Sequence, residues 1–276
     1  IMNSKNNDLQ STDRKSSGFD LSQKKCIVSD LDGTVFIGRK PIDGTVAFIK
    51  KYGDSLEFFF LSNNTSMIPE DYIALLNSFG ITTDRKHIIA PHGPLIKYLS
   101  EEKLNNIFLI ANQRYTEFLK NELPELNING SSNNCQTVVI AYDTELTYEK
   151  LKNASLILQK DNIKFLATHN DEVCPTEQGL IPDAGSILAL LESSTGRKPH
   201  RIFGKPNREL LSSVLEKYES DEIVIVGDRL YTDKLLADRA GIDFILVLSG
   251  ESTGFDAEKG VSPPRLILND LGELLD

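Results

Sequence analysis

Short runs of hydrophobic residues alternate along the chain with longer stretches whose hydrophobic residues recur every three or four positions. The short runs are rich in β-branched and aromatic residues, which favour strands, and the longer stretches have helical periodicity. The strand candidates of a first group are residues 26–29, 56–61, 223–226 and 244–248. This alternation is typical of α/β proteins that are built on a parallel sheet.

Two of the helical stretches begin at a proline, a residue that is common in the first turn of a helix. After Pro69, hydrophobic residues recur on one face until Gly80 ends the pattern. These residues are Tyr72, Leu75, Leu76 and Phe79. A second helix is predicted from Pro206, and its hydrophobic face consists of Leu210, Leu211, Val214, Leu215 and Tyr218.

The middle of the chain predicts further strands at residues 107–110, 137–141 and 163–167, with helical stretches near 114–122 and 147–161. The pattern alone leaves two alternatives open, because these strands could extend the first sheet or form a separate one. Clusters of Gly, Ser, Asn and Pro interrupt the pattern at residues 127–134 and 194–199, and we interpret the second cluster as a linker.

The composition predicts a folded protein, because 40% of the 276 residues are hydrophobic and 25% are charged, as in ordinary globular proteins. The formal net charge of −10 would repel a nucleic acid backbone, so nucleic acid is not an expected partner. The hydrophobic runs are too short to cross a membrane, so no membrane partner is expected either. Residues 1–22 are polar and predict a loosely attached N-terminal tail.

Cysteine usage gives a hint about the redox environment. Cys26, Cys135 and Cys174 are odd in number, widely spaced and outside any Cys-x-x-Cys pattern. This arrangement argues against a disulfide framework and against a zinc site. We therefore expect a reducing, cytoplasmic location.

The first candidate for chemistry follows the first predicted strand, where Asp30 and Asp32 are separated by one residue and followed by Gly33 and Thr34. A simple turn would also explain Asp and Gly at this point. A calcium-binding EF-hand loop does not fit, because Val35 stands where that loop requires Gly. The chain also lacks a Walker A motif and a Gly-x-Gly-x-x-Gly motif.

Polar side chains also follow two other predicted strands. Ser62, Asn63 and Asn64 come after one, and Asp228 and Asp233 come after another. Ligands of open α/β sheets bind at the carboxyl ends of the strands. These clusters therefore predict a single crevice.

Lys205 lies immediately before the Pro206 that is predicted to begin a helix. A lone lysine is most often a solvated surface residue. Here, however, a cation would stand beside a helix N-terminus, which attracts anions through its free N–H groups and its dipole. We expect Lys205 and that helix to bind an anion together.

These motifs, and their order along the chain, resemble those of the haloacid dehalogenase-like (HAD) hydrolase superfamily. The resemblance covers residues 24–276. The matching motifs are Asp30-x-Asp32-Gly33-Thr34, Ser62-Asn63, Lys205-Pro206 and Gly227-Asp228-x-x-x-x-Asp233. The resemblance implies an α/β fold with a Rossmann-like parallel-sheet core and a large inserted α/β cap domain.

Spacing places the expected insertion. There are 29 residues between Asp32 and Ser62, but 142 between Ser62 and Lys205, so the cap is expected in the second interval. The three middle strands then form a separate sheet. The predicted division is a tail at 1–22, a core domain at 23–82 and 197–276, and a cap domain at 83–196.

Within the cap, the segments AYDTELTYEKL and ATHNDEVCPTEQGLIPDAGSI resemble subfamily IIA, which has a C2-type cap. This group includes NagD-like, phosphoglycolate phosphatase-like and p-nitrophenyl phosphatase-like proteins. By this resemblance, Asn170 and Asp171 line the entrance to the site, although a solvated turn would also explain them. His169 departs from the group, in which Asn commonly follows the Thr directly, and this leaves the cap specificity open.

The resemblance also assigns roles at the core. Mg²⁺ would be held by the carboxylates of Asp30 and Asp228 and by the backbone carbonyl of Asp32, with Asp233 in support. Lys205 would be a second cation beside the phosphate. Ser62 and the backbone amide of Asn63 would donate hydrogen bonds to the phosphoryl oxygens, with Asn64 and Gly33 nearby. Without cations, a carboxylate about 3.5 Å from a phosphate dianion would be repelled by roughly 9 kcal/mol at an effective dielectric constant of about 20.

The resulting hypothesis is a Mg²⁺-dependent phosphatase of a small soluble phosphomonoester, either a sugar phosphate or a nucleotide-like ester. Asp30 would be the nucleophile that forms an aspartyl-phosphate, and Asp32 the general acid and base. Phosphoglycolate and pyridoxal phosphate remain alternative substrates, and a phosphotransferase or a non-catalytic sensor of a phosphorylated ligand remains an alternative function. The resemblance also makes a homodimer through the cap an expectation.

Overall fold

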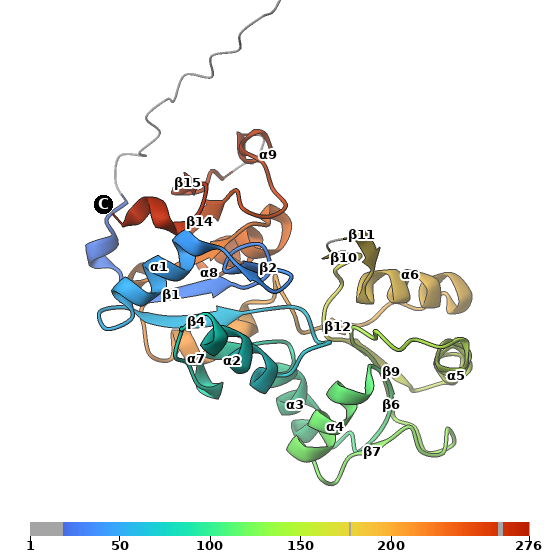
Figure 1. The fold of residues 1–276 in the computed structure, drawn as a ribbon. Coiled ribbons are helices and arrows are strands. Elements are labelled where there is room, and N and C mark those ends of the chain that lie inside the picture. Colours follow the sequence, from blue (N-terminus) through green and yellow to red (C-terminus); the bar gives the residue numbers. More distant parts are fainter. Residues whose placement is uncertain (1–18, 177, 259–261, 276) are drawn as a thin grey trace, which may run out of the picture.

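The computed structural model describes residues 19–176, 178–258 and 262–275. Two parallel sheets, each covered by helices, lie next to one another (Figure 1). The predicted N-terminal tail lies almost entirely outside the described residues. In the part of the chain that is described, no helix is long and apolar enough to cross a membrane. The three cysteines are free thiols.

The first sheet has six parallel strands in the order β15-β14-β13-β1-β4-β5. Their bounds are β1 (Cys26–Asp30), β4 (Glu57–Leu61), β5 (Ile88–Ile89), β13 (Ile223–Gly227), β14 (Asp243–Val247) and β15 (Leu266–Leu268). The associated helices are α1 (Asp43–Tyr52), α2 (Pro69–Ser78), α7 (Ser212–Leu215), α8 (Leu235–Ala240) and α9 (Gly254–Glu258). We call this part the core.

The core sheet is buried on both faces, which explains why its strands are continuous hydrophobic runs and not alternating ones. Ile27 packs on one face with Phe48 of α1 and Tyr72 of α2. Its neighbour Val28 packs on the opposite face with Leu236 of α8. Successive side chains of a strand point to opposite faces, so one short strand contributes to two hydrophobic layers.

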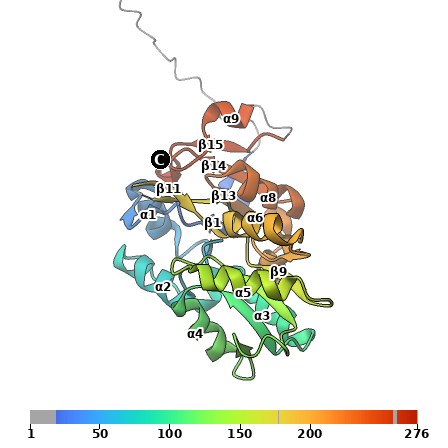
Figure 2. The ribbon, with the colours of Figure 1, turned by 90° about the vertical axis from the view of Figure 1, so that its right-hand side faces the viewer.

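The second sheet has five parallel strands in the order β12-β9-β8-β6-β7, and we call this part the cap. Its strands are β6 (Asn106–Ile110), β7 (Asn127–Ile128), β8 (Thr137–Ile140), β9 (Lys164–Ala167) and β12 (Arg201–Ile202). Its helices are α3 (His92–Glu101), α4 (Gln113–Glu122), α5 (Tyr148–Leu158) and α6 (Ala184–Thr195). Helices α3 and α4 cover one face, and α5 and α6 cover the other, which faces the viewer in Figure 2. The prediction of an α/β fold with a second, separate sheet is confirmed.

Two antiparallel hairpins lie where the core meets the cap. The core contributes β2 (Phe36–Ile37) and β3 (Lys40–Pro41), and the cap contributes β10 (Val173–Thr176) and β11 (Gly179–Pro182). Both line the cavity described below.

The structure corrects the helix that was predicted to begin at Pro206. The chain instead forms a 3₁₀ turn at Arg208–Leu211, followed by the single helical turn of α7. The reason is local: Asn207 is extended, and its side chain accepts a hydrogen bond of 3.0 Å from the Glu209 N–H. Lys205 therefore does not stand at a helix N-terminus, and the expected anion site of that kind is wrong.

Strand pairing also bears on where the chain passes between the two parts. β5 pairs with β4 in the core sheet, and β12 pairs with β9 in the cap sheet. We therefore propose that the chain enters the cap after residue 89 and leaves it after residue 202, a few residues later than the predicted boundaries.

Candidate active site

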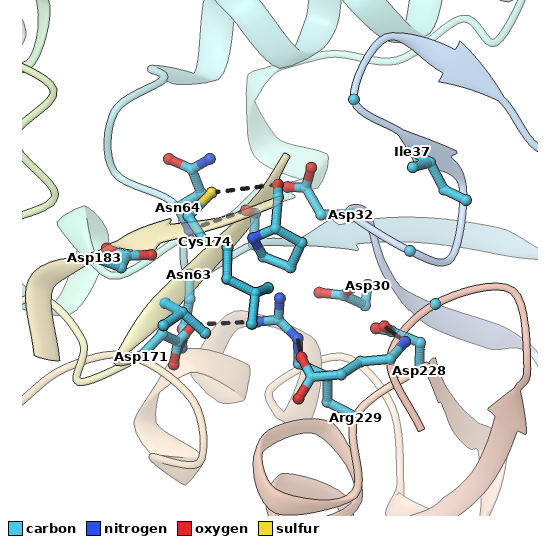
Figure 3. A pocket seen from close by; sticks show the side chains of 18 of the residues that line it. Asp30, Asp32, Ile37, Asn63, Asn64, Asp171, Cys174, Asp183, Asp228 and Arg229 are labelled. Atoms are coloured by element: carbon cyan, nitrogen blue, oxygen red, sulfur yellow. Dashed lines mark hydrogen bonds and ion pairs between the residues drawn. The ribbon is translucent and has the colours of Figure 1, made fainter. Parts of the chain in front are cut away.

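A cavity of about 320 Å³ lies at the carboxyl ends of the central core strands, facing the cap (Figure 3). Asp30 is the last residue of β1, Ser62 follows β4 directly, and Asp228 follows β13 directly. All three line the cavity, together with Lys205. The carboxyl ends of neighbouring parallel strands meet at one edge of the sheet, which explains how four distant segments come together.

Lys205 is buried between two carboxylates. Its Nζ contacts Asp30 Oδ1 and lies 2.7 Å from Asp233 Oδ1, and the residue is only 2% exposed. Burial opposes the charge on Lys205, but the carboxylates of Asp233 and Asp30 outweigh it and hold the Lys205 pKa above its usual value. The ammonium group is therefore charged, and it partly neutralises Asp30.

Three buried carboxylates form a group that fits a divalent cation. One oxygen each of Asp30, Asp228 and Asp233 lies within 4.8 Å of the others. Asp228 Oδ2 accepts a hydrogen bond of 2.7 Å from the Glu251 N–H, whereas no described residue donates to its buried Oδ1. Because carboxylate oxygens are the ligands that Mg²⁺ prefers and one of them is buried without a donor, the residues present fit this metal.

The pKa values of this group show the cost of holding the carboxylates together. Burial raises the pKa of Asp30 well above its usual value, and Asp233 and Asp228 raise it further, against the effect of Lys205. Burial and the nearby charge of Asp233 raise the pKa of Asp228 to about 6. A divalent cation would reverse both effects, since it stabilises the ionised forms.

Gly33 makes the close approach of the first loop to Asp228 feasible. Its φ of +90° lies in the region that favours glycine. A Cβ at this position would stand 2.5 Å from Asp228 Oδ2. Gly33 also lines the cavity, so a larger residue there would displace a carboxylate of the site.

Asp32 lines the same cavity and has a different environment from Asp30. Burial raises the pKa of Asp32 to about 6, with Arg229 and Lys205 opposing the increase and Asp183 adding to it. A carboxyl group with a pKa near neutrality can both donate and accept a proton, which suits a general acid and base.

The loop after β4 is held by a hydroxyl that the sequence did not indicate. Ser62 Oγ lies 2.9 Å from the Tyr72 hydroxyl, which in turn donates to the Asn64 carbonyl at 2.9 Å. Asn63 Oδ1 accepts a 2.7 Å hydrogen bond from the Lys205 N–H. The hydrophobic pattern of α2 identified Tyr72 as a packing residue, and no sequence signal distinguished the hydroxyl.

The cap side of the cavity contains Asp171, whose carboxylate faces core residues. Asn63 Nδ2 donates to it at 3.1 Å, and Arg229 Nη1 lies 3.4 Å from it. The neighbouring Asn170 is exposed and lines a second cavity instead. Arg229 follows Asp228 directly in the sequence, and this adjacency to a predicted ligand was the only signal of its role.

The remainder of the cap side comes from the β10–β11 hairpin and the start of α6. Val173, Cys174, Pro175 and Leu180 line the cavity, as does Asp183. His169, which is completely buried, places Nε2 2.9 Å from Asp183 Oδ1.

Comparisons with known proteins agree with this geometry. A family described as haloacid dehalogenase-like hydrolase matches residues 27–122, and one described as HAD-hydrolase-like matches residues 202–274. An acid sugar phosphatase of Staphylococcus epidermidis is 30% identical over 88% of this chain and 93% of its own length. This chain belongs to the HAD-like hydrolases.

Solved structures place this HAD-like hydrolase in the NagD and p-nitrophenylphosphatase branch, subfamily IIA, with a C2 cap. The 4-nitrophenylphosphatase of Thermotoga maritima is similar with a TM-score of 0.83 and 34% identity, over 92% of this chain and 97% of that one. A glycerol phosphate phosphatase of Mycobacterium tuberculosis in complex with magnesium has a TM-score of 0.80 and 27% identity, over 92% of this chain and 77% of that one. The predicted family is confirmed.

Proposed function

We propose that this protein is a Mg²⁺-dependent phosphatase that hydrolyses a small phosphomonoester, such as a sugar phosphate, through an aspartyl-phosphate. The observation that carries the proposal is the environment of Asp30. Lys205 contacts one of its oxygens, Asp228 lies beside it with an acceptor that lacks a donor, and Asp32 lines the same cavity. The relatives named above are an acid sugar phosphatase, a 4-nitrophenylphosphatase and a glycerol phosphate phosphatase, and this range supports a phosphomonoester substrate without identifying it.

Two steps account for the roles of the acid pair. In the first, a carboxylate oxygen of Asp30 forms a bond to phosphorus while the bond from phosphorus to the ester oxygen breaks. Asp32 gives its proton to the departing oxygen, so the alcohol leaves neutral. In the second, water forms a bond to phosphorus, Asp32 accepts its proton, and the bond to Asp30 breaks. Inorganic phosphate leaves, and both carboxyl groups return to their initial state.

The phosphoryl group needs donors and positive charge around it during both steps. Lys205 supplies one cation, and Ser62 and the Asn63 backbone N–H are the donors at the end of β4. No described residue accepts a hydrogen bond from that N–H, which leaves it available to the substrate. Bound through Asp30, Asp228 and the Asp32 carbonyl, with Asp233 in support, Mg²⁺ would supply charge that offsets the repulsion between carboxylate and phosphate.

The test is phosphate release from p-nitrophenyl phosphate. Asp30→Asn should lower turnover at least about 10⁴-fold, because it removes the nucleophile. The exposed acid Asp54 of the core offers a matched control, and Asp54→Asn should keep wild-type turnover. Chelation should abolish wild-type turnover, and added Mg²⁺ should restore it.

The same assay separates the phosphatase from a sensor of phosphorylated ligands, which would bind without turnover. Quenching in acid should trap a phosphorylated chain in the wild type and none in Asp30→Asn. Undiminished turnover or labelling of that variant would contradict the assignment of the nucleophile.

A further inference from the structure

The charges that line the cavity are strongly unequal. Among its described lining residues, the cations are Lys205 and Arg229. The carboxylates are Asp30, Asp32, Asp171, Asp183, Asp228 and Glu251. A divalent cation would offset part of the negative charge at the core side, where the phosphate itself would add to it. It would not offset the carboxylates of the cap side.

Both cations are already engaged by carboxylates. Lys205 is shared between Asp30 and Asp233. Arg229 places Nη1 3.4 Å from Asp171 and Nε 3.0 Å from Glu251. In the described part of the cavity there is therefore no spare cation to bind a second anionic group of a substrate.

Asp183 brings a carboxylate to the cap side of the cavity, toward which the alcohol of an ester bound at Asp30 would extend. It caps the N-terminus of α6, and its Oδ1 accepts from the Ala184 N–H and lies 2.9 Å from His169 Nε2. No described residue donates a hydrogen bond to its Oδ2. Figure 3 shows Asp183 on the cap side, opposite Asp30 and Asp228. The role of Asp183 as N-cap of α6 therefore accounts for Oδ1 and leaves Oδ2 available to a ligand.

Asp171 adds a second carboxylate close to Asp183 on the cap side of the cavity. One acceptor atom each of His169, Asp171 and Asp183 lies within 4.8 Å of the others. The rest of this wall is largely apolar, with Ile37 from the core hairpin and Val173 and Leu180 from the cap hairpin. A carboxylate only accepts hydrogen bonds, so this surface favours a donor and repels an anion.

We propose that Asp183 selects phosphomonoesters whose alcohol carries a hydrogen-bond donor and no negative charge. An ammonium group is favoured most, a hydroxyl group is accepted, and a carboxylate is rejected. The proposal rests on the phosphatase function proposed above and narrows its substrate class. It disfavours phosphoglycolate, whose alcohol carries a carboxylate.

The experiment uses esters that differ only in their terminal group. Phosphoethanolamine, 2-hydroxyethyl phosphate and phosphoglycolate form a two-carbon series, and the three-carbon homologues extend its reach. Each is measured at about pH 7 with Mg²⁺, as a substrate and as an inhibitor of p-nitrophenyl phosphate hydrolysis. We expect the carboxylate esters to be at least about tenfold weaker than the hydroxyl esters, because like charges would be placed together in a water-poor site.

Asp183→Asn should reduce this carboxylate penalty about tenfold. The penalty is measured as the ratio of kcat/KM between the hydroxyl and the carboxylate ester of equal length, so a change in turnover common to both esters does not affect it. The side-chain oxygen of Asn can still accept from the Ala184 N–H, and Asp183→Ser is a second variant that keeps an N-cap residue. Asp161→Asn removes an equal charge from an exposed position of the cap and should leave the penalty unchanged.

Two outcomes would overturn the proposal: carboxylate esters that bind and react as well as hydroxyl esters in the wild type, or a penalty that survives in both Asp183 variants. A wild type that fails to hydrolyse p-nitrophenyl phosphate would instead contradict the proposed function. Thermal unfolding of each variant shows whether a loss of activity reflects a loss of fold.

Discussion

The two walls of the cavity are built in different ways. The core wall consists of strand ends, and its side chains are almost inaccessible: Asp30 is 4% exposed and Ser62 is 3% exposed. The cap wall is largely a two-stranded hairpin in which Leu180 is 69% exposed. Under the proposals above, the buried sheet edge carries the chemistry, and the cap wall carries selectivity through the buried Asp183 beside an exposed hairpin. The hairpin itself can then vary at little cost in stability.

The core wall contains paired charges that are buried. Lys205 is held between Asp30 and Asp233, and its backbone N–H donates to Asn63. Each of these residues comes from a different segment of the core. The residues to which we assign catalytic roles therefore also connect the core segments, and a substitution there should affect stability and activity at once.

The largest expected effect is the loss of stability when the buried cation of the core wall is removed. Lys205→Met leaves Asp30 and Asp233 buried without their partner, and we expect the free energy of unfolding to fall by about 3–5 kcal/mol. Urea unfolding of the metal-free protein measures the change. Added Mg²⁺ should recover part of it, since the ion would supply charge to the same carboxylates.

The control for this variant is Lys25→Met, which breaks an exposed pair with Glu222. The free energy of unfolding should stay unchanged there, because exposed ion pairs contribute little. Equal stability of Lys205→Met and the wild type would show that the charge pairs do not hold the core wall.

The sequence predicted the core wall well, because its strands are continuous hydrophobic runs. A parallel sheet covered on both faces requires continuous hydrophobic runs, so strands were predicted at residues 26–29 and 223–226, and the polar residues after them were conspicuous. The observed strands, Cys26–Asp30 and Ile223–Gly227, are each one residue longer. All the expected core positions except Asp233 line the cavity, and Asp233 lies behind Lys205.

The cap wall was not predictable in the same way. β10 and β11 are exposed along most of their length, so they lack a hydrophobic pattern that would identify them as strands. Asp183 has a position that a helix cap would explain equally well. Arg229 and Tyr72 act through contacts between distant segments, which only the folded chain brings together.

Asp171 is a residue of the cap wall that contacts residues of the core wall. Its carboxylate accepts from Asn63 and lies near Arg229. We expect Asp171→Ala to lower kcat/KM for p-nitrophenyl phosphate by about 10–100-fold, as is usual when a supporting partner of a site residue is lost. Asp171→Asn should recover part of this, because its amide oxygen can still accept from Asn63.

The kinetic readout distinguishes this supporting role from a general weakening of the cap. Asp161→Ala changes an exposed acid of the cap and should keep wild-type kcat and KM. Wild-type kinetics of Asp171→Ala would show that the contact between the walls has no role in positioning Asn63. An equal loss in Asp161→Ala would show that the effect is not specific to that contact.

The smallest effect is expected in the exposed hairpin of the cap wall. It tests whether residues of that hairpin can be replaced without loss of stability. Leu180→Ser changes an exposed leucine of β11, so the free energy of unfolding should shift by no more than about 0.5 kcal/mol. KM for p-nitrophenyl phosphate should rise only a few-fold, since one partly exposed apolar contact is lost.

The matched control, Leu166→Ala, removes a fully buried leucine of β9 in the same domain and should lower the free energy of unfolding by about 2–5 kcal/mol. A Leu180 variant as unstable as the Leu166 variant would mean that the hairpin is part of the cap's folding core, and selectivity could then not change independently of stability.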